Sequence, residues 1–114
     1  MSHLYCLNDD HSVVPIEDVA TWGRWMEDAD RTVELTVGAT WRVSTMFLGI
    51  DYCWLGGEPI LFETMTFGGP RAGEMLRYHS WDEAVIGHRG EVEATLRAIA
   101  GVNAIAIECG AVMR

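Results

Sequence analysis

The sequence predicts an α+β domain in which an antiparallel sheet, a meander around one long central hairpin, packs with two helices. Residues 42–51 and 59–69 are rich in β-branched and aromatic residues, and the loop between them contains Gly56 and Gly57. This is the pattern of a β-hairpin with a longer connection. Two other stretches repeat apolar residues at helical spacing. No repeat, linker or low-complexity tract divides the chain, so we expect a single domain, residues 1–114.

The N-terminal third predicts a short hairpin, a helix and an edge strand. Asn8 to His11 favours a tight turn, because Asn and Asp side chains bond to nearby backbone groups. After Pro15, which suits the first turn of a helix, apolar residues recur at helical spacing through residue 30. An alternating stretch then predicts a half-buried strand toward a sheet edge. The three strands expected here are residues 4–7, 12–14 and 31–37.

The central hairpin carries a prediction about register and burial. The pairing that we expect sets Met46 opposite Thr64, so that Glu63 shares the other face with Phe47. Both faces are then largely apolar, whereas a sheet with one wet face alternates apolar and polar residues. The sequence therefore predicts a central hairpin that is covered on both sides.

The C-terminal part predicts a short strand, a helix and a last apolar segment. Residues 74–78 follow a Gly-Gly-Pro break and favour a strand. Ser80 to Glu83 has the spacing of a capping box, which predicts that a helix starts there, and Gly101 is the expected stop. Residues 104–109 favour a last short strand or a segment packed on the surface. The expected apolar face of the helix is Trp81, Ala84, Val85, His88, Val92, Leu96 and Ile99.

Charge is the most unusual bulk property of the chain. There are 17 acidic and 8 basic residues, for a net charge of −9, and every base is Arg. Such a balance repels nucleic acid and anionic membranes, so neither is an expected partner. The first 30 residues contain many acidic residues, and Arg24 is the one basic residue among them. They predict either a solvated surface or an acidic patch that docks a basic partner protein.

The cysteines and the N-terminus favour a cytoplasmic location. Cys6, Cys53 and Cys109 are widely spaced and form no Cys-x-x-Cys pair, which favours reduced thiols. The chain begins without a secretory signal, and no apolar run reaches the ~20 residues of a membrane span.

Two residues are candidates for chemistry. Glu63 lies mid-strand among apolar residues, where an ionised carboxylate needs a partner. It is either held by Arg42, Arg77 or a backbone donor, or it is a perturbed catalytic acid. His88 lies on the apolar helix face, where it is either a core histidine bonded to a carbonyl or to Glu63, or a metal ligand.

Other residues are candidates for a contact surface. Asp51 ends the first long strand, and Tyr52 and Trp54 open a loop that either contacts a partner or folds back over the sheet edge. Trp25 is either a partly buried edge residue or a binding anchor. Asp28 and Asp30 belong to the acidic N-terminal part.

No sequence motif points to catalysis, a metal or a cofactor. The glycines of residues 68–73 form neither a phosphate-binding loop nor a dinucleotide fingerprint. No nucleophile elbow is present, and the histidines show no metal-binding spacing. We therefore expect a protein that is not an enzyme and holds no cofactor or metal.

The segments VSTMFLGID, LFETMTFGG and RYHSWDEA…GH resemble a family of short proteins from phage and prophage genomes and some bacterial chromosomes. The resemblance spans roughly residues 22–88, and no activity is assigned to that family. Its members often carry His after the Asp at the strand end, where this chain has Tyr52. The resemblance implies a phage-type accessory protein in the host cytoplasm.

Three functional hypotheses follow. The first is a non-enzymatic accessory protein that binds a host macromolecule, such as a defence component, as an anti-CRISPR-like inhibitor does. The second is a homodimeric structural module in which a second chain covers one sheet face. The third is a small hydrolase or ligand-binding protein, which requires Glu63, Asp51 and His88 to converge in one pocket.

Overall fold

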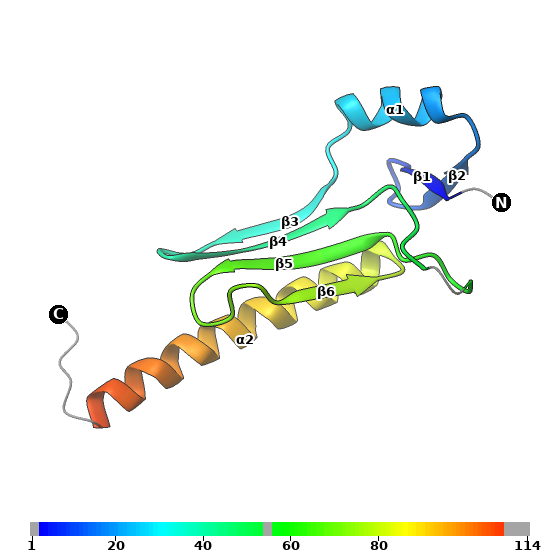
Figure 1. Cartoon of the computed structure of the whole chain (residues 1–114). Helices are drawn as coiled ribbons and strands as arrows, with labels where there is room; N and C mark the ends of the chain where they lie inside the picture. The colour runs from blue at the N-terminus through cyan, green and yellow to red at the C-terminus, as the bar shows by residue number, and fades with distance from the viewer. Residues whose placement is uncertain (1–2, 54–55, 109–114) are drawn as a thin grey trace.

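The computed structural model of the protein describes residues 3–53 and 56–108 (Figure 1). The described chain forms a four-stranded antiparallel sheet in the order β3-β4-β5-β6, a two-stranded antiparallel sheet β1-β2, and two helices. The prediction of an α+β fold with a meander around a central hairpin is confirmed. The elements are β1 Leu4–Leu7, β2 Val13–Ile16, α1 Val19–Asp28, β3 Thr32–Val37, β4 Trp41–Phe47, β5 Phe62–Gly68, β6 Met75–Tyr78 and α2 Trp81–Glu108.

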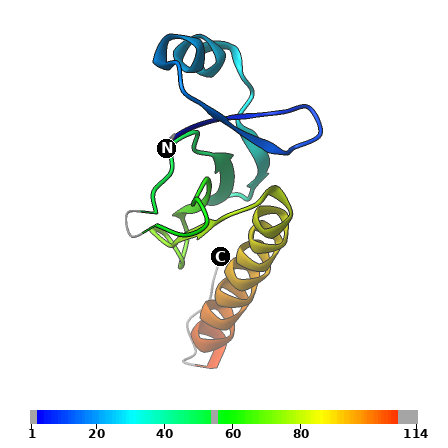
Figure 2. The same ribbon diagram turned by 90° about the vertical axis from the view of Figure 1, so that its right-hand side faces the viewer.

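The N-terminal elements form a lobe at one end of the four-stranded sheet. Helix α1 packs on β1 and β2, while α2 packs on the four strands of the larger sheet, so the two helices lie apart (Figures 1 and 2). The lobe is tied to the sheet by its backbone. Tyr5 N–H donates to the Gly49 carbonyl (2.9 Å), and Asp51 N–H donates to the His3 carbonyl (2.9 Å).

Helix α1 begins later than expected. Pro15 and Ile16 belong to β2, where a proline is tolerated because the two-stranded sheet leaves an edge free. Asp18 caps the helix and accepts a hydrogen bond from Ala20 N–H (3.3 Å). The prediction that the helix follows directly on Pro15 was therefore wrong, because the helix begins at Val19.

Helix α2 begins where the sequence predicts and ends later. The Ser80 hydroxyl accepts from Glu83 N–H (3.2 Å), and the Glu83 carboxylate accepts from Ser80 N–H (3.1 Å), which makes a complete capping box. The helix continues through Gly101 to Glu108, so the predicted stop was wrong, and of the two alternatives for residues 104–109 the strand was wrong for residues 104–108. Cys109 lies outside the described residues. An exposed glycine weakens a helix by only about 1 kcal/mol, which does not suffice to end one.

The register of the central hairpin differs by one residue from the prediction. Phe47 pairs with Phe62 and Met46 pairs with Glu63, whereas the expected pairing set Met46 opposite Thr64. Because side chains alternate along a strand, this shift moves every side chain of β5 to the other face relative to β4. Gly68 is needed at the turn end of the ladder, since its φ is +70° and a Cβ there would lie 2.3 Å from the Thr40 carbonyl.

Within residues 3–53 and 56–108, a helix covers the four-stranded sheet on one face only. Helix α2 lies behind it in Figure 1 and contacts all four strands. The prediction of a hairpin covered on both sides was therefore wrong. We call the side under α2 the covered face; its strand residues, from the register, are Glu34, Thr36, Val43, Thr45, Phe47, Phe62, Thr64, Thr66, Leu76 and Tyr78. The opposite side is the open face, formed by Thr32, Leu35, Val37, Arg42, Ser44, Met46, Glu63, Met65, Phe67, Met75 and Arg77.

The apolar core lies at the end of the sheet next to the N-terminal lobe. Phe47, Leu61, Phe62 and Ala84 are fully buried there. The rings of Phe47 and Phe62 lie 5.3 Å apart, and residues of the lobe, of β3 and of α2 pack around them. The opposite end of the covered face, towards the β3–β4 turn, is filled by polar side chains instead.

Candidate functional site: the open face and the polar layer beneath the sheet

A chain of hydrogen bonds connects α2 to all four strands on the covered face. The Thr45 hydroxyl lies 2.7 Å from His88 Nδ1 and 2.6 Å from the Thr64 hydroxyl, which also accepts from Tyr78 OH (3.0 Å). The Thr36 hydroxyl lies 2.8 Å from His88 Nε2. Both imidazole nitrogens are therefore engaged with hydroxyl groups of the protein itself.

His88 is a core histidine, as one of the two sequence interpretations held, but its partners differ from the expected ones. Burial lowers the pKa of His88, and the Glu34 carboxylate, 3.5 Å from Nε2, opposes that shift. The neutral imidazole is thus the stable form, and it can donate from one nitrogen and accept at the other. Such a ring fastens α2 to the sheet and is closed to solvent.

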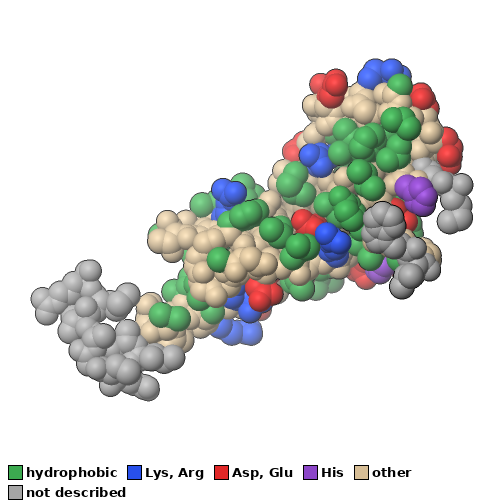
Figure 3. Space-filling view, viewed as in Figure 1, with side chains coloured by type: hydrophobic (Ala, Val, Ile, Leu, Met, Phe, Trp, Pro, Cys, Tyr) green, Lys and Arg blue, Asp and Glu red, His purple; other side chains and the backbone are tan. Residues whose placement is uncertain are grey.

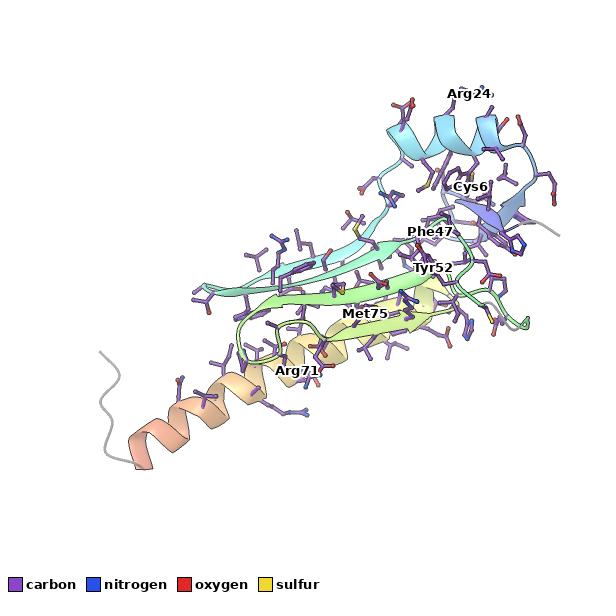
Figure 4. The ribbon with its side chains drawn as sticks, in the orientation of Figure 1. Cys6, Arg24, Phe47, Tyr52, Arg71 and Met75 are labelled. Atoms are coloured by element: carbon purple, nitrogen blue, oxygen red, sulfur yellow. The ribbon has the colours of Figure 1, made fainter. Side chains whose placement is uncertain are left out.

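Glu91 forms a second buried polar centre one helical turn further along α2. Its carboxylate accepts two hydrogen bonds from Arg71, at 2.9 and 2.8 Å, and one from the Thr66 hydroxyl at 2.7 Å. These bonds, led by those from Arg71, lower the pKa of Glu91. Arg71 comes from the β5–β6 connection and reaches α2 from outside (Figure 4). The pair anchors the middle of α2 to that connection.

Sequence analysis missed Glu91, although a signal for it exists. Glu91 follows Ala84 by seven residues and His88 by three, so it lies on the same helical face. The apolar pattern predicts that Leu96 lies on the buried face of α2. In the structure Leu96 is exposed. Thr95 is fully buried in its place. The buried side of α2 is more polar than any apolar pattern suggests.

Glu63 lies on the open face, away from His88. It accepts a hydrogen bond from Arg77 Nε (3.1 Å), which was one of the structural partners expected. The Arg77 guanidinium also lies over the Tyr52 ring, 4.8 Å from its centroid. The hydrolase hypothesis required Glu63 and His88 to converge, and the sheet separates them. Glu63, Arg77 and Tyr52 form one contact cluster at the lobe end of the open face.

Asp51 has a structural role in its loop. Its carboxylate accepts hydrogen bonds from Cys53 N–H (2.7 Å) and Ile60 N–H (3.0 Å), which closes the connection between β4 and β5. Asp51 and Tyr52 also line a cavity of about 400 Å³ together with residues on either side of them. Trp54, a predicted contact residue, lies outside the described residues.

The remaining predicted contact residues belong to the lobe. Trp25 is half-buried and sets its ring edge-on to Phe47, with centroids 5.8 Å apart. Asp28 is exposed at the end of α1, and Asp30 accepts a hydrogen bond from Thr32 N–H (3.0 Å). Trp25 and Asp30 line one cavity together, whereas Asp28 does not line it.

The open face exposes large apolar side chains in a connected set of strands. Leu35 is 53% exposed, Val37 68%, Phe67 39% and Met75 47%. The Arg42 guanidinium lies over the Phe67 ring, 4.4 Å from its centroid. Figure 3 shows hydrophobic side chains along the strands on this face, and Met75 projects from β6 in Figure 4. Exposed apolar patches of this kind mark interaction surfaces.

Two kinds of site do not occur in the described part of the chain. Residues 3–53 and 56–108 hold no cluster of three or more His, Cys, Asp or Glu side chains that could bind a metal ion. Within the same residues, neither helix has the length and apolar character that a membrane span needs.

Comparisons with known proteins leave the family open. No protein-family model matches the chain, and no curated protein or solved structure was found to be similar to it.

Proposed function

We propose that this protein is a small non-enzymatic accessory protein that acts in the cytoplasm by binding a partner protein through its open face. The observation that carries the proposal is the exposure of Leu35, Val37, Phe67 and Met75 on the uncovered side of a four-stranded sheet. Burial of apolar surface is the main driving force of protein association. A chain that leaves this surface in water gains stability when a partner covers it.

The charge of the open face indicates the chemistry of that partner. The chain carries a net charge of −9, yet Glu63 is the only acid among the open-face residues, and it is paired with Arg77. Arg42 adds a second cation, stacked on Phe67. A partner surface with an apolar centre and a few carboxylates at its rim complements this face. A basic surface does not.

The phage-type resemblance of residues 22–88 supports a host protein as the partner, with a component of host defence as the candidate class. A small inhibitor needs no catalytic centre, only a surface that blocks another protein. The buried polar partners of His88 and Glu91 are consistent with this, since both side chains are fully engaged inside the fold.

The test is affinity capture from a host lysate with matched variants. Val37→Glu places a charge on the apolar surface, and Ile86→Glu is the control, because Ile86 is an exposed apolar residue on α2 outside the open face. A specific partner should be retained by the wild type and Ile86→Glu and lost with Val37→Glu. Its retention by Val37→Glu, or catalytic turnover found in a substrate screen, contradicts the proposal.

A second candidate is a homodimer in which another copy covers the open face, and the exposed end of α2 offers that copy a further contact. The 28 residues of α2 span about 42 Å, while the 7 residues of β4 span about 23 Å. The C-terminal part of α2 therefore runs beyond the sheet (Figure 1), with Leu96 and Val102 half-exposed. Unsupported helix ends are marginal in water. The radius of gyration, 17.7 Å, also exceeds the value of about 13 Å for a compact chain of this length.

Sedimentation or light scattering at micromolar concentration separates the two candidates. A monomer removes the homodimer and leaves the host-protein proposal intact. A dimer that Val37→Glu dissociates and Ile86→Glu does not assigns the open face to a second copy instead.

A further inference from the structure

A cavity of about 370 Å³ lies between the N-terminal lobe and the start of α2. Four separate segments build it: the β1–β2 turn, the end of α1, the start of β3 and the first residue of α2. Apart from Thr32, which pairs with Met46, none of its described lining residues belongs to the open face. The described residues that line it are Leu7, Asn8, Asp9, His11, Trp25, Ala29, Asp30, Thr32 and Trp81.

Two indole rings form walls of the cavity and are held in place by the core. Trp25 sets its ring edge-on to Phe47, and Trp81 does the same to Phe62, with centroids 6.3 Å apart. His11 stacks flat on Trp81, with ring centroids 3.6 Å apart and an angle of 9° between the planes. The walls are thus already arranged before any ligand arrives.

The electrostatics of the cavity are one-sided. Asp9 and Asp30 contribute carboxylates, none of the described lining residues is Arg or Lys, and His11 is the one lining residue among them that can become positively charged. The C-terminal end of α1, where a helix dipole is negative, lies at the same place, and its last turn contains no base. Glu27 and Asp28 stand in that turn. Acids at a helix C-terminus are unfavourable, so a cation bound here would relieve repulsion that the fold contains.

We propose that this cavity binds a guanidinium group, with the planar cation packed against the indoles of Trp25 and Trp81, hydrogen-bonded to Asp9 and Asp30, and on a side of Trp81 that His11 does not cover. An aromatic face attracts a cation, and Trp does so more strongly than Tyr or Phe. A guanidinium also matches carboxylates through its fork of donors, whereas an ammonium offers neither planarity nor a bidentate fork. The site is therefore specific for guanidinium over ammonium.

The group comes either from a free small molecule or from an Arg side chain of a partner protein. The relevant probes are methylguanidinium, arginine amide and a blocked Arg-containing tripeptide, with citrulline amide as the uncharged analogue. Binding is followed by NMR of the indole N–H signals of the ¹⁵N-labelled full chain, because the signals of Trp25 and Trp81 should shift.

The expected result is that arginine amide shifts those two signals and that citrulline amide does not. Asp30→Asn and Asp9→Asn should each weaken binding about tenfold. The side-chain amide introduced by Asp30→Asn still offers an oxygen to Thr32 N–H, so the turn is kept. Asp28→Asn is the matched control, since it removes one charge from the same lobe at a residue that does not line the cavity. Val37→Glu should bind like the wild type, which separates this site from the open face.

Tighter binding of the Arg-containing tripeptide than of methylguanidinium identifies a polypeptide source, and equal binding identifies a free guanidinium compound. The proposal is overturned if citrulline amide binds as well as arginine amide. It is also overturned if Asp28→Asn weakens binding as much as Asp30→Asn, or if none of the probes shifts the two signals.

Discussion

On the covered face of the sheet, Thr45, Thr64 and Thr66 are buried under α2, whereas on the open face Leu35 and Val37 are exposed to water. Hydroxyl groups lie inside and aliphatic side chains lie outside, the reverse of the usual arrangement for a sheet with one solvated face. The comparison teaches that the two faces have different tasks. The covered face holds α2 in one position, and the open face leaves apolar side chains exposed, which is the basis of the proposed partner binding.

The buried polar layer is tolerated because its hydroxyl groups, His88 and Glu91 are satisfied; Glu34 Oε2, 3.5 Å from His88 Nε2, is a buried oxygen of this layer that lacks a hydrogen bond within the described residues. A buried hydroxyl without a partner costs free energy, while a satisfied network adds rigidity. Thr45 and Thr64 bond to each other and to His88 and Tyr78, and Thr66 bonds to Glu91. Gly87 leaves room for Tyr78 in this layer. A Cβ on residue 87 would lie only 2.2 Å from atoms of the Tyr78 side chain.

The largest expected effect contrasts two phenylalanines of β5. Phe62 is fully buried and Phe67 is partly exposed on the open face. Phe62→Ala should lower the free energy of unfolding by about 3–5 kcal/mol because it leaves a cavity in the core. Phe67→Ala should lower it by about 1 kcal/mol or less. Urea unfolding measures both, and equal losses would mean that the open face is stabilised from within the monomer.

A second contrast concerns two of the ion pairs, Glu91 with Arg71 and Glu63 with Arg77. Glu91→Gln removes charge-assisted hydrogen bonds from Arg71 and Thr66 in a buried site and should cost about 2–3 kcal/mol. Glu63→Gln disrupts the partly exposed pair with Arg77 and should cost less than about 1 kcal/mol. The same unfolding experiment tests this prediction. It fails if the two variants are equally stable.

The third prediction concerns pH. Because the folded protein lowers the pKa of His88 below its usual 6.5, the unfolded chain binds a proton that the folded chain does not. Above pH 6.5 the protonation of His88 does not reduce the free energy of unfolding. The free energy of unfolding decreases as the pH falls towards 5, by up to about 1.4 kcal/mol per pH unit.

His88→Gln is the control for this effect. It keeps a side chain that can donate to and accept from the threonines, and the slope between pH 7 and 5 should become flatter. Glu91 acts at lower pH, below its usual pKa of 4.5, where protonation removes the stability that its own lowered pKa provides. If the free energy of unfolding of His88→Gln has the same slope against pH as the wild type, His88 is not the cause of the pH dependence.

The smallest expected effect lies on the open face. Leu35→Thr and Val37→Thr keep β-branched or strand-compatible side chains at exposed positions of an edge strand. Each should change the free energy of unfolding by no more than about 0.5 kcal/mol in the isolated chain. A large loss in dilute protein, where a dimer is dissociated, would show that the face is not free in the monomer.

Local signals in the sequence were sufficient to predict the kinds of element and several of their ends. The capping box of Ser80 and Glu83 marks the start of α2, and the alternation of residues 31–37 marks an edge strand. These features depend on neighbouring residues only. Arg77 was one of several partners expected for Glu63, but the choice among them and the threonine partners of His88 were not predictable in the same way, because they depend on which face each side chain occupies.

The residues alone determined an α+β chain with a central hairpin, a capped second helix and an acidic N-terminal part. Only the tertiary structure decided the register of β4 against β5, the single covered face and the end of α2. The physical reason is that both faces of the hairpin mix Thr or Ser with large apolar residues, so a shift by one residue leaves the local pattern almost unchanged. The packing of α2 over Thr45, Thr64 and His88 selects one register, and that choice places Glu63 and the apolar side chains on the open face.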